Sequence, residues 1–432
     1  MSKSKNVLPI IAMIFLFGMI AFVTNLASPM GDILKNQFGV ANWAGTLGVF
    51  ANFIAYAVMG YPAGNLLHKL GYKKTALIAI AIGFIGVGIQ TLAGALGSFY
   101  VYLLGAFIAG FSMCLLNTVV NPMLNNLGGS GNKGNQLIQV GGSFNSLCGT
   151  AVIILTGILI PEIAKASISD VFPLMAAALT IFAFAFVVIA FTPIPEKQET
   201  QKATAESAQY SALSFRHFVL GAIGIFVYVG VEVGIPNVLN KWLQNEELKS
   251  MLLGNGAAQA EAIAGSVAAT YWLLMLVGRL IGASIGSKVS AKSMLAVASA
   301  AGLLLTVIAI FTPYSVHVDM PVFKKPADGL FGFTEVPLSA MLLVLIGLCT
   351  SVMWGGIFNL AVEGLGKYTE KASGIFMVLV CGGGILPLLQ NAIVDWTGNY
   401  MVSYWVIVAG LVYLLYYAIV GSKNVNKDIP VD

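Results

Sequence analysis

Long apolar runs recur at regular intervals along the chain, and short polar segments separate them. Each run is long enough to cross about 30 Å of hydrocarbon at about 1.5 Å per helical residue. The runs are continuous and lack the alternation of a barrel strand, so they predict helices. Six runs lie in the first part of the chain, at 8–34, 43–67, 75–96, 99–124, 137–160 and 171–193.

The longest polar stretch lies at the middle of the chain, from Thr192 to His217. Six more apolar runs follow it, at 218–241, 263–287, 293–312, 337–364, 373–394 and 402–421. We therefore predict an all-α membrane protein of twelve transmembrane helices in two pseudo-symmetric six-helix bundles. The predicted domains are an N-terminal bundle at 1–193, a cytoplasmic linker at 194–217 and a C-terminal bundle at 218–432.

The composition supports a lipid environment. Of the 432 residues, 58% are hydrophobic and 9% are charged, whereas a soluble protein carries about 25% charged residues. A lipid bilayer is therefore the expected solvent for most of the surface. The net charge of +4 gives no indication of nucleic acid. The four cysteines lie in apolar runs without a CxxC pair, so a metal or redox site has no support.

The basic residues of the predicted loops set the orientation. With both termini inside, fifteen Lys and Arg fall in inside loops, six fall outside and Arg279 lies within a span, which accounts for all 22. Positive charge favours the cytoplasmic side, so both termini and the linker are expected there. The first apolar run continues past the length of a signal-peptide core and is read as a span.

The loop after the second run reads Gly64-Asn-Leu66-Leu-His68-Lys69-Leu-Gly71-Tyr-Lys73-Lys74. It resembles the loop signature of the major facilitator superfamily, glycine-x-leucine-x-acid-basic-x-glycine-basic-basic. The resemblance implies a gating role for Gly64, His68, Lys69, Gly71 and Lys73. His68 stands where the family carries an acid, so we expect an altered gating ion pair. A plain basic cytoplasmic loop is the alternative.

Further stretches resemble the fucose and glucose/galactose:cation symporter branch, nearest its glucose/galactose side. They extend from the first span to the eleventh and comprise Gly31-Asp32-Ile33-Leu34, Pro62-Ala63-Gly64, Asn121-Pro122, Phe144-Asn145-Ser146, Tyr228-Val229-Gly230-Val231-Glu232-Val233, Gly278-Arg279, Gly382-Gly383-Gly384-Ile385 and Pro387-Leu388-Leu389-Gln390. The resemblance implies a sugar transporter of a bacterial cytoplasmic (inner) membrane, with the major facilitator fold.

Two acids lie well within predicted spans, Asp32 and Glu232. Glu232 is 14 residues into its span, about 21 Å along a helix. Burial disfavours the charged form of a carboxylate, so both acids are candidates for proton coupling. The alternatives are an interfacial position for Asp32 and a purely structural, hydrogen-bonded Glu232.

The first and seventh spans share a helix-breaking pattern. Asn25 precedes Pro29 by four residues, as Glu232 precedes Pro236. Proline removes the helical hydrogen bond to the residue four places back, and interrupted helices in corresponding places of two repeats indicate a substrate site.

Other polar and aromatic residues of the spans suit a neutral sugar. Amides both donate and accept hydrogen bonds, and aromatic faces stack on the C–H side of a sugar ring. Interhelical hydrogen bonding is the alternative for each. With Asn25, the candidate substrate-binding residues are Asn117, Asn121, Gln139, Asn145, Asn237, Asn240, Trp272, Trp354, Asn359, Gln390 and Asn391.

The sequence departs from the branch at three places. Asn117 replaces a glutamate of the fucose porters, Gly142 replaces a glutamine and Gly355 replaces a proline. Loss of the first acid makes Glu232 the better coupling candidate, and the two glycines reshape the pocket. Arg279 is expected to serve gating or packing, with binding of an anionic sugar as the alternative.

We therefore expect a secondary active transporter that takes up a hexose-like sugar by symport with a cation, in the first place H⁺, through alternating access. The alternatives are sodium-coupled or uncoupled sugar transport, or transport of an amino or acidic sugar. No enzyme is expected, because His68, His217 and His317 fall in loops or at span ends. We expect no cofactor beyond the co-transported ion, and a monomer.

Overall fold

The computed structural model describes residues 7–38, 47–129, 132–160, 166–195, 210–245, 248, 257–323 and 331–431. In the N-terminal half, defined as α1 to α6, long helices follow one another closely. They are α1 (Val7–Phe38), α3 (Leu47–Leu96), α4 (Phe99–Gly128), α5 (Lys133–Leu159), the short η3 (Ile168–Val171) and α6 (Phe172–Phe191).

The second and third predicted spans are two helices that meet at a kink at Gly71, without a longer loop between them, and together they make up α3. The predicted loop is helical on both sides of Gly71, whose φ of 78° and ψ of 178° kink the element. Residues with a side chain rarely adopt such a φ, which explains a glycine at this position of the loop signature.

The C-terminal half, defined as α7 to α16, contains more interruptions. It begins with η5 (Ala212–Ser214), α7 (Arg216–Leu243), α9 (Ala257–Ile285) and α10 (Ala291–Phe311). The tenth to twelfth predicted spans are each divided into shorter pieces. The pieces are α11 (Leu338–Thr350), α12 (Met353–Val362), η7 (Gly366–Tyr368), α13 (Thr369–Val378), η8 (Leu379–Cys381), α14 (Gly382–Thr397), α15 (Tyr400–Ser403), α16 (Trp405–Tyr416) and η9 (Tyr417–Gly421).

The described helices account for twelve membrane crossings. Ten stretches of the described residues are long and apolar enough to span, and one of them, Phe50–Leu96, has 47 residues. At about 1.5 Å per residue that stretch suffices for two crossings. The 27-residue α5 supplies one more, which gives the predicted number.

Two short strands between α10 and α11 accompany the predicted helices. Strands β1 (His317–Phe323) and β2 (Phe331–Pro337) pair antiparallel. Alternate residues of the hairpin face inward, since Met320, Val322 and Val336 are buried. The alternation of apolar and polar residues in His-Val-Asp-Met-Pro-Val is typical of a strand. The segment is too short to stand out among the long apolar runs of the sequence.

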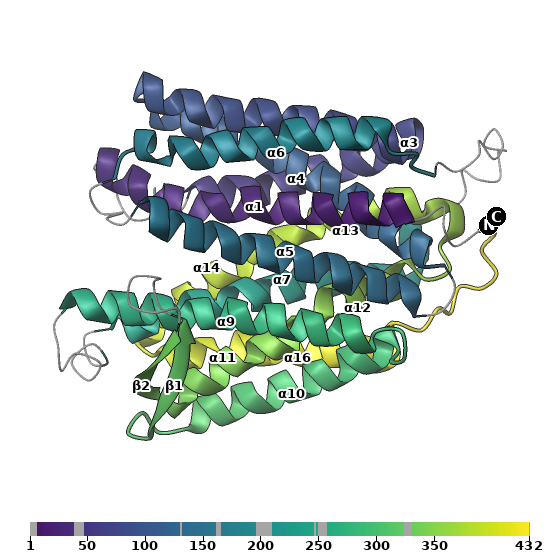
Figure 1. Cartoon of the computed structure of the whole chain (residues 1–432). Coiled ribbons are helices and arrows are strands. Elements are labelled where there is room, and N and C mark those ends of the chain that lie inside the picture. Colours follow the sequence, from purple (N-terminus) through teal and green to yellow (C-terminus); the bar gives the residue numbers. More distant parts are fainter. Residues whose placement is uncertain are drawn as a thin grey trace.

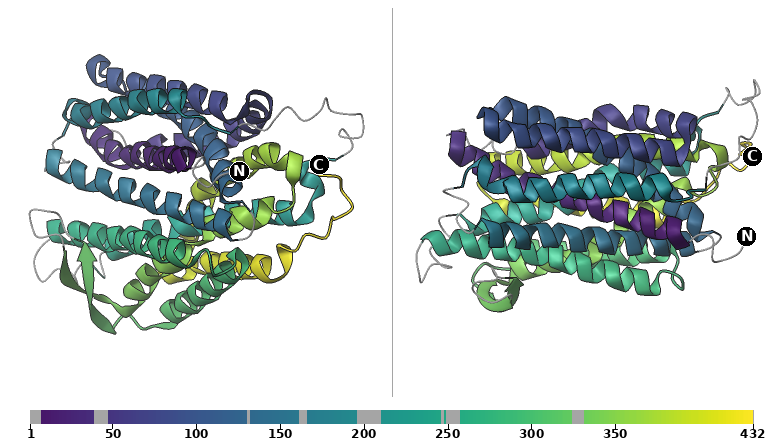
Figure 2. Two further views of the ribbon diagram at one scale, coloured as in Figure 1. Left: turned by 45° about the vertical axis from the view of Figure 1, so that its right-hand side comes forward. Right: turned by 45° about the horizontal axis from the view of Figure 1, so that its top comes forward.

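The two halves lie side by side (Figures 1 and 2). Within the N-terminal half, α3 packs on α4 and α6, and α1 packs on α4 and α5; within the C-terminal half, α7 packs on α12, α14 and α16. The main contacts between the halves join α3 to α13 and α5 to α9. These two pairs of helices frame the candidate site.

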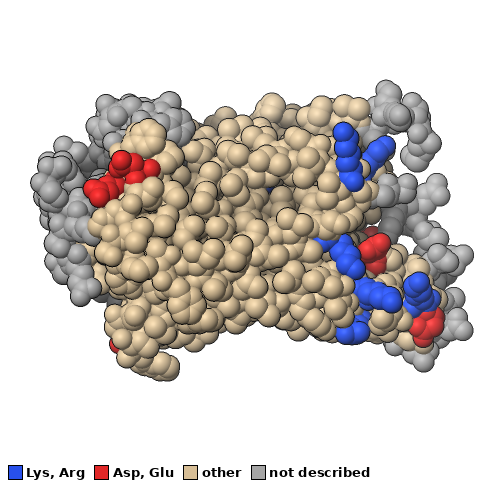
Figure 3. All heavy atoms as spheres, turned by 90° about the horizontal axis from the view of Figure 1, so that it is seen from below, with Lys and Arg blue, Asp and Glu red and all other residues tan. Residues whose placement is uncertain are grey.

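Basic side chains mark one end of the molecule. On the face shown in Figure 3, Lys and Arg gather toward the end at which α1 begins and the last described residues lie (Figures 1 and 3). We call this end the basic end. By the distribution of positive charge, it is the end expected in the cytoplasm.

Candidate functional site

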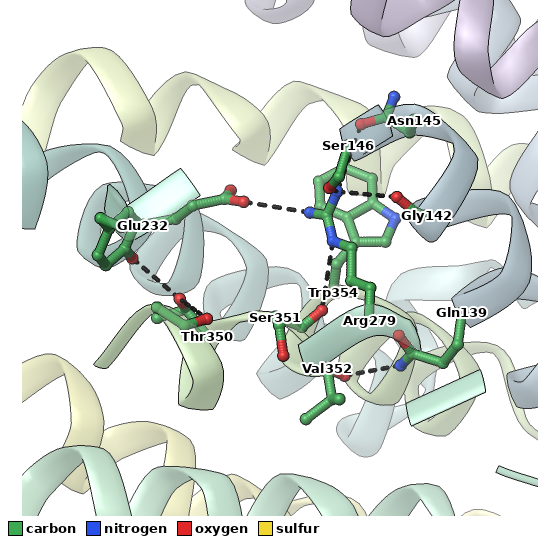
Figure 4. Close-up of polar contacts among 12 residues, drawn as sticks. Gln139, Gly142, Asn145, Ser146, Glu232, Arg279, Thr350, Ser351, Val352 and Trp354 are labelled. Carbon is green, nitrogen blue, oxygen red and sulfur yellow. Dashed lines mark hydrogen bonds and ion pairs between the residues drawn. The ribbon is translucent and has the colours of Figure 1, made fainter. Parts of the chain in front are cut away.

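Two embedded charges meet at the centre of the molecule. Glu232 on α7 and Arg279 on α9 form an ion pair with 3.3 Å between Oε1 and Nη2, and their side chains are only 13% and 12% exposed (Figure 4). Charges inside a membrane protein are costly unless paired and usually mark function. Sequence reasoning named both residues, but it could not pair them because 47 positions separate them.

Arg279 also reaches α5 of the N-terminal half. Its Nη1 donates to Ser146 Oγ at 2.6 Å, and the Gly142 carbonyl and Asn145 Oδ1 accept at 3.2 and 3.3 Å (Figure 4). Its Nε donates to the Ser351 carbonyl at 3.4 Å. One guanidinium therefore links the predicted coupling acid to the other half of the molecule. Ser146 was not among the predicted site residues.

Aromatic rings surround the ion pair. Tyr228 lies one helical turn before Glu232 on α7 and is fully buried, and its ring centroid is 6.3 Å from that of Trp354. Trp354 contacts Phe376 edge to face. Tyr271 shares a hydrogen bond of 2.9 Å with Thr350. The pair thus lies in a mostly apolar setting, where water competes little for its charges.

A chain of hydrogen bonds joins three predicted substrate residues. Asn117 Nδ2 donates to Tyr56 OH at 2.7 Å, and Asn121 Nδ2 donates to the Asn117 carbonyl at 2.8 Å. Trp354 Nε1, from α12, donates to Asn121 Oδ1 at 3.0 Å. The structure therefore brings Asn117, Asn121 and Trp354 together across the two halves, and it adds Tyr56.

Two other predicted residues bridge the halves nearer the basic end. Gln139 Nε2 donates to the Val352 carbonyl at 2.9 Å, and Asn359 Nδ2 donates to Asn125 Oδ1 at 2.7 Å. A Cβ at Gly355 would lie 2.8 Å from Gln139 Nε2, so this glycine permits the close approach.

The remaining predicted substrate residues lie away from this cluster. Asn25 bonds its own helix at the Ala21 carbonyl, and Trp272 is 36% exposed. Toward the opposite end of α7 and α14, Asn391 joins Asn237 and Lys241.

Three further predicted residues are Asn240, Gln390 and Asp32. Asn240 accepts a bond from Gln244. Gln390 is fully buried, and its amide has no partner among the described residues. The side chain of Asp32 lies outside the described residues, although its backbone belongs to α1.

The predicted gating residues lie where α3 meets α13. A Cβ at Gly64 would be 3.0 Å from Gly374 Cα, so the two backbones nearly touch. His68 Nδ1 lies 3.8 Å from Oε2 of the buried Glu370. The family's acid is thus replaced by a histidine that faces an acid of the other half. Lys69 is exposed, and Lys73 donates to the Thr192 carbonyl at 3.1 Å.

The family model of the Major Facilitator Superfamily matches residues 10–387. The chain belongs to the Major Facilitator Superfamily. It is accordingly a membrane transporter and not an enzyme.

Curated relatives of this Major Facilitator Superfamily chain match along most of its length. The chain is 28% identical over 432 residues to the glucose/galactose transporter of Brucella abortus, covering 98% of this chain and 96% of that protein. It is 23% identical to the L-fucose-proton symporter of Escherichia coli, covering 88% and 86%. The resemblance to this branch, expected from the motifs, is confirmed.

Solved structures of other superfamily members share the fold. The transporter FucP in its outward conformation superposes with a TM-score of 0.80 at 19% identity, covering 97% of this chain and 100% of that one. The proton:xylose symporter XylE, bound to 6-bromo-6-deoxy-D-glucose, gives a TM-score of 0.67 at 14% identity, covering 96% and 97%. The predicted major facilitator fold is confirmed.

The contacts between the halves of this superfamily member gather toward the basic end. Apart from the central bonds of Arg279 to α5, the bridges described above come from the basic-end portions of α3, α4, α5, α12 and α13, and Ser373 of α13 adds a bond of 3.0 Å to the Thr118 carbonyl. The described residues thus form a structure that is closed at its basic end.

Proposed function

We propose that this protein takes up a hexose-like sugar together with a proton by alternating access. The relatives named for glucose, galactose and fucose support the substrate class. The observation that carries the coupling is the embedded Glu232, paired with Arg279, which also bonds α5 of the N-terminal half. A buried carboxylate can bind a proton on one side of the membrane and release it on the other.

Alternating access needs two bodies that move against each other. The bundles at 1–193 and 218–432 fill this role, and the linker at 194–217 holds them together on the cytoplasmic side. The basic end, closed in this structure, faces the cytoplasm of a bacterial inner membrane. Sugar then enters from the opposite end and leaves once the basic end opens. The transporter works as a monomer, since each copy contains both bundles.

Sugar recognition falls to residues that now bond each other between the halves. Trp354, Asn121 and Asn117 form one such group, and Gln139 and Asn145 lie on the facing α5. Sugar hydroxyls can replace these protein–protein hydrogen bonds without leaving amides unsatisfied. An indole face then packs against the apolar side of the ring.

The geometry favours a proton over Na⁺. A sodium ion needs a cage of oxygen ligands, and a guanidinium 3.3 Å from Glu232 would repel it. A proton needs only the carboxylate. Asp32 is retained as a second coupling candidate on the strength of its motif alone.

The test is uptake of labelled glucose, galactose, fucose, mannose and N-acetylglucosamine into vesicles containing the purified protein. A pH gradient and a sodium gradient are imposed separately. We expect at least one hexose to accumulate under the pH gradient and none to respond to sodium. Failure of every sugar under both gradients contradicts the proposal.

A further inference from the structure

Arg279 divides its donors between the two halves of the molecule. Toward the C-terminal half it contacts Glu232 and the Ser351 carbonyl, and toward α5 it contacts Gly142, Asn145 and Ser146 (Figure 4). The bond to Ser146, at 2.6 Å, is the shortest of the five. The guanidinium therefore serves both as counter-ion of an acid and as a clamp on α5.

The two charges of the pair differ in how they respond to pH. An arginine side chain stays protonated throughout the range in which proteins function. Glu232 is the carboxylate among the described partners of Arg279 and can gain a proton. Protonation would leave the guanidinium without its counter-charge in an apolar setting, where an unpaired charge is costly.

Other titratable groups against Glu232 stay neutral near neutral pH. They are Tyr228 on the same helix and Tyr271 on α9, with Cys349 of α11 against Tyr271. Phenols and thiols ordinarily lose protons only above pH 8 or so. Glu232 is therefore the group through which pH acts on Arg279.

Gly142 provides the room in which the guanidinium meets α5. A Cβ at this position would lie 3.5 Å from Arg279 Cδ and 3.7 Å from its Nε. These are contact distances, so an alanine fits, whereas a longer side chain would compete with the arginine. The bare backbone also exposes the carbonyl that accepts the bond from Nη1.

We propose that Arg279 is a positioning residue that makes the contact between α5 and α9 depend on the charge of Glu232. With Glu232 ionised, the guanidinium is held in place and binds α5. A proton entering from the outer side neutralises Glu232, and Arg279 then turns toward water or a sugar hydroxyl. Its bonds to α5 reorganise, and the basic end is released to open.

This inference deepens the proposed function and depends on it only for Glu232 as the proton carrier. It predicts that contact between α5 and α9 weakens as pH falls, even without sugar. Gln136 reports on that contact, because its Nε2 donates to the Ala283 carbonyl of α9 at 3.0 Å.

The experiment measures thiol labelling of Gln136→Cys in purified protein whose four native cysteines are replaced by serine. Because the thiolate is the form that reacts, each rate is divided by the rate of the same variant unfolded in detergent at the same pH. With Arg279 present, we expect this relative rate to rise by at least about fivefold as pH is lowered, which is the lower end of typical coupling between sites. With Arg279→Gln we expect no dependence on pH. An unchanged pH dependence in Arg279→Gln overturns the proposal.

Matched variants separate charge from packing. Arg279→Lys keeps the charge and should retain the pH dependence. It serves as the test of the proposal if Arg279→Gln does not fold. A labelling rate that does not change with pH in the lysine variant overturns the proposal. Ser146→Ala removes one bond to α5 and should raise labelling at every pH while the slope persists. Arg216→Gln, at the start of α7, should change nothing.

The outcomes separate this inference from the proposed function. Sugar uptake with a flat labelling response in the parent protein contradicts the role of Arg279 and leaves the transport proposal standing. Labelling that depends on both pH and Arg279 supports the switch even if none of the tested sugars is transported.

Discussion

Two contacts close the basic end, and they are built on different principles. In the α3–α13 contact, Gly60 and Gly64 meet Gly374, and backbone lies on backbone. In the α5–α9 contact, Arg279 bonds α5 through Ser146 and neighbouring groups. The first depends on fit and the second on charge. In the proposed cycle, protonation of Glu232 would act on the α5–α9 contact, whereas the α3–α13 contact would part as a rigid surface.

The largest expected effect is steric and lies in the α3–α13 contact. A Cβ at Gly374 would lie 2.5 Å from the Gly60 carbonyl oxygen and from Gly64 N and Cα. Backbone cannot yield as a side chain can, and overpacking costs about 1–3 kcal/mol. Gly374→Val should therefore prevent closure of the basic end and lower the initial rate of uptake about 5- to 150-fold.

Gly88→Ala is the control for that variant. Gly88 also lies in α3, but a Cβ there meets nothing within 4 Å, so transport should be unchanged. Wild-type uptake by Gly374→Val would show that the two backbones need not touch during the cycle.

A smaller effect is expected at Gly355 of α12. Here α12 meets α5 through the flexible side chain of Gln139. A Cβ would lie 2.8 Å from Gln139 Nε2, and the amide can move at the loss of its bond to the Val352 carbonyl. A hydrogen bond contributes about 0.5–1.5 kcal/mol, so Gly355→Ala should slow uptake about 2- to 13-fold. Gly356→Ala is the neighbouring control, because its nearest contact would be an ordinary 3.5 Å. Equal effects in the two variants would contradict the assigned role of Gln139.

The smallest effect is expected at His68, since it is 47% exposed and lies 3.8 Å from Glu370. His68→Asp restores the acid of the family signature but places it against another acid. Exposed charge pairs are worth about 0.2–1 kcal/mol, so uptake should fall about two- to fivefold. His68→Lys places a cation opposite Glu370 and should transport normally. A gain in rate on restoring aspartate would show that transport does not need a histidine opposite Glu370.

The sequence allowed the architecture to be predicted because lipid imposes long apolar helices of fixed length. The spans, the bundle order and the family followed from that constraint and from the motifs. The sharp kink at Gly71 that joins the two helices of α3 and the divided tenth to twelfth spans did not, because apolar periodicity is the same on both sides of a kink. The paired strands β1 and β2 were not predicted, because they lie between the predicted spans at 293–312 and 337–364, where a loop was expected.

The candidate site was predictable by residue type and less so by role. Glu232 and Arg279 were recognised because embedded charges are rare, but their pairing depends on how α7 and α9 pack. Several amides expected to bind sugar instead bond other helices, as Asn359 does with Asn125. The sequence alone does not distinguish a buried amide that binds a ligand from one that bonds a neighbouring helix. Both are the same type of residue within an apolar run.

Glu232→Gln tests the central claim, that Glu232 couples proton and sugar movement, most directly. The amide resembles the protonated acid and cannot release a proton. In vesicles, we expect this variant to exchange labelled for unlabelled sugar across the membrane while failing to accumulate sugar under a pH gradient. Accumulation by Glu232→Gln equal to that of the wild type would contradict the account.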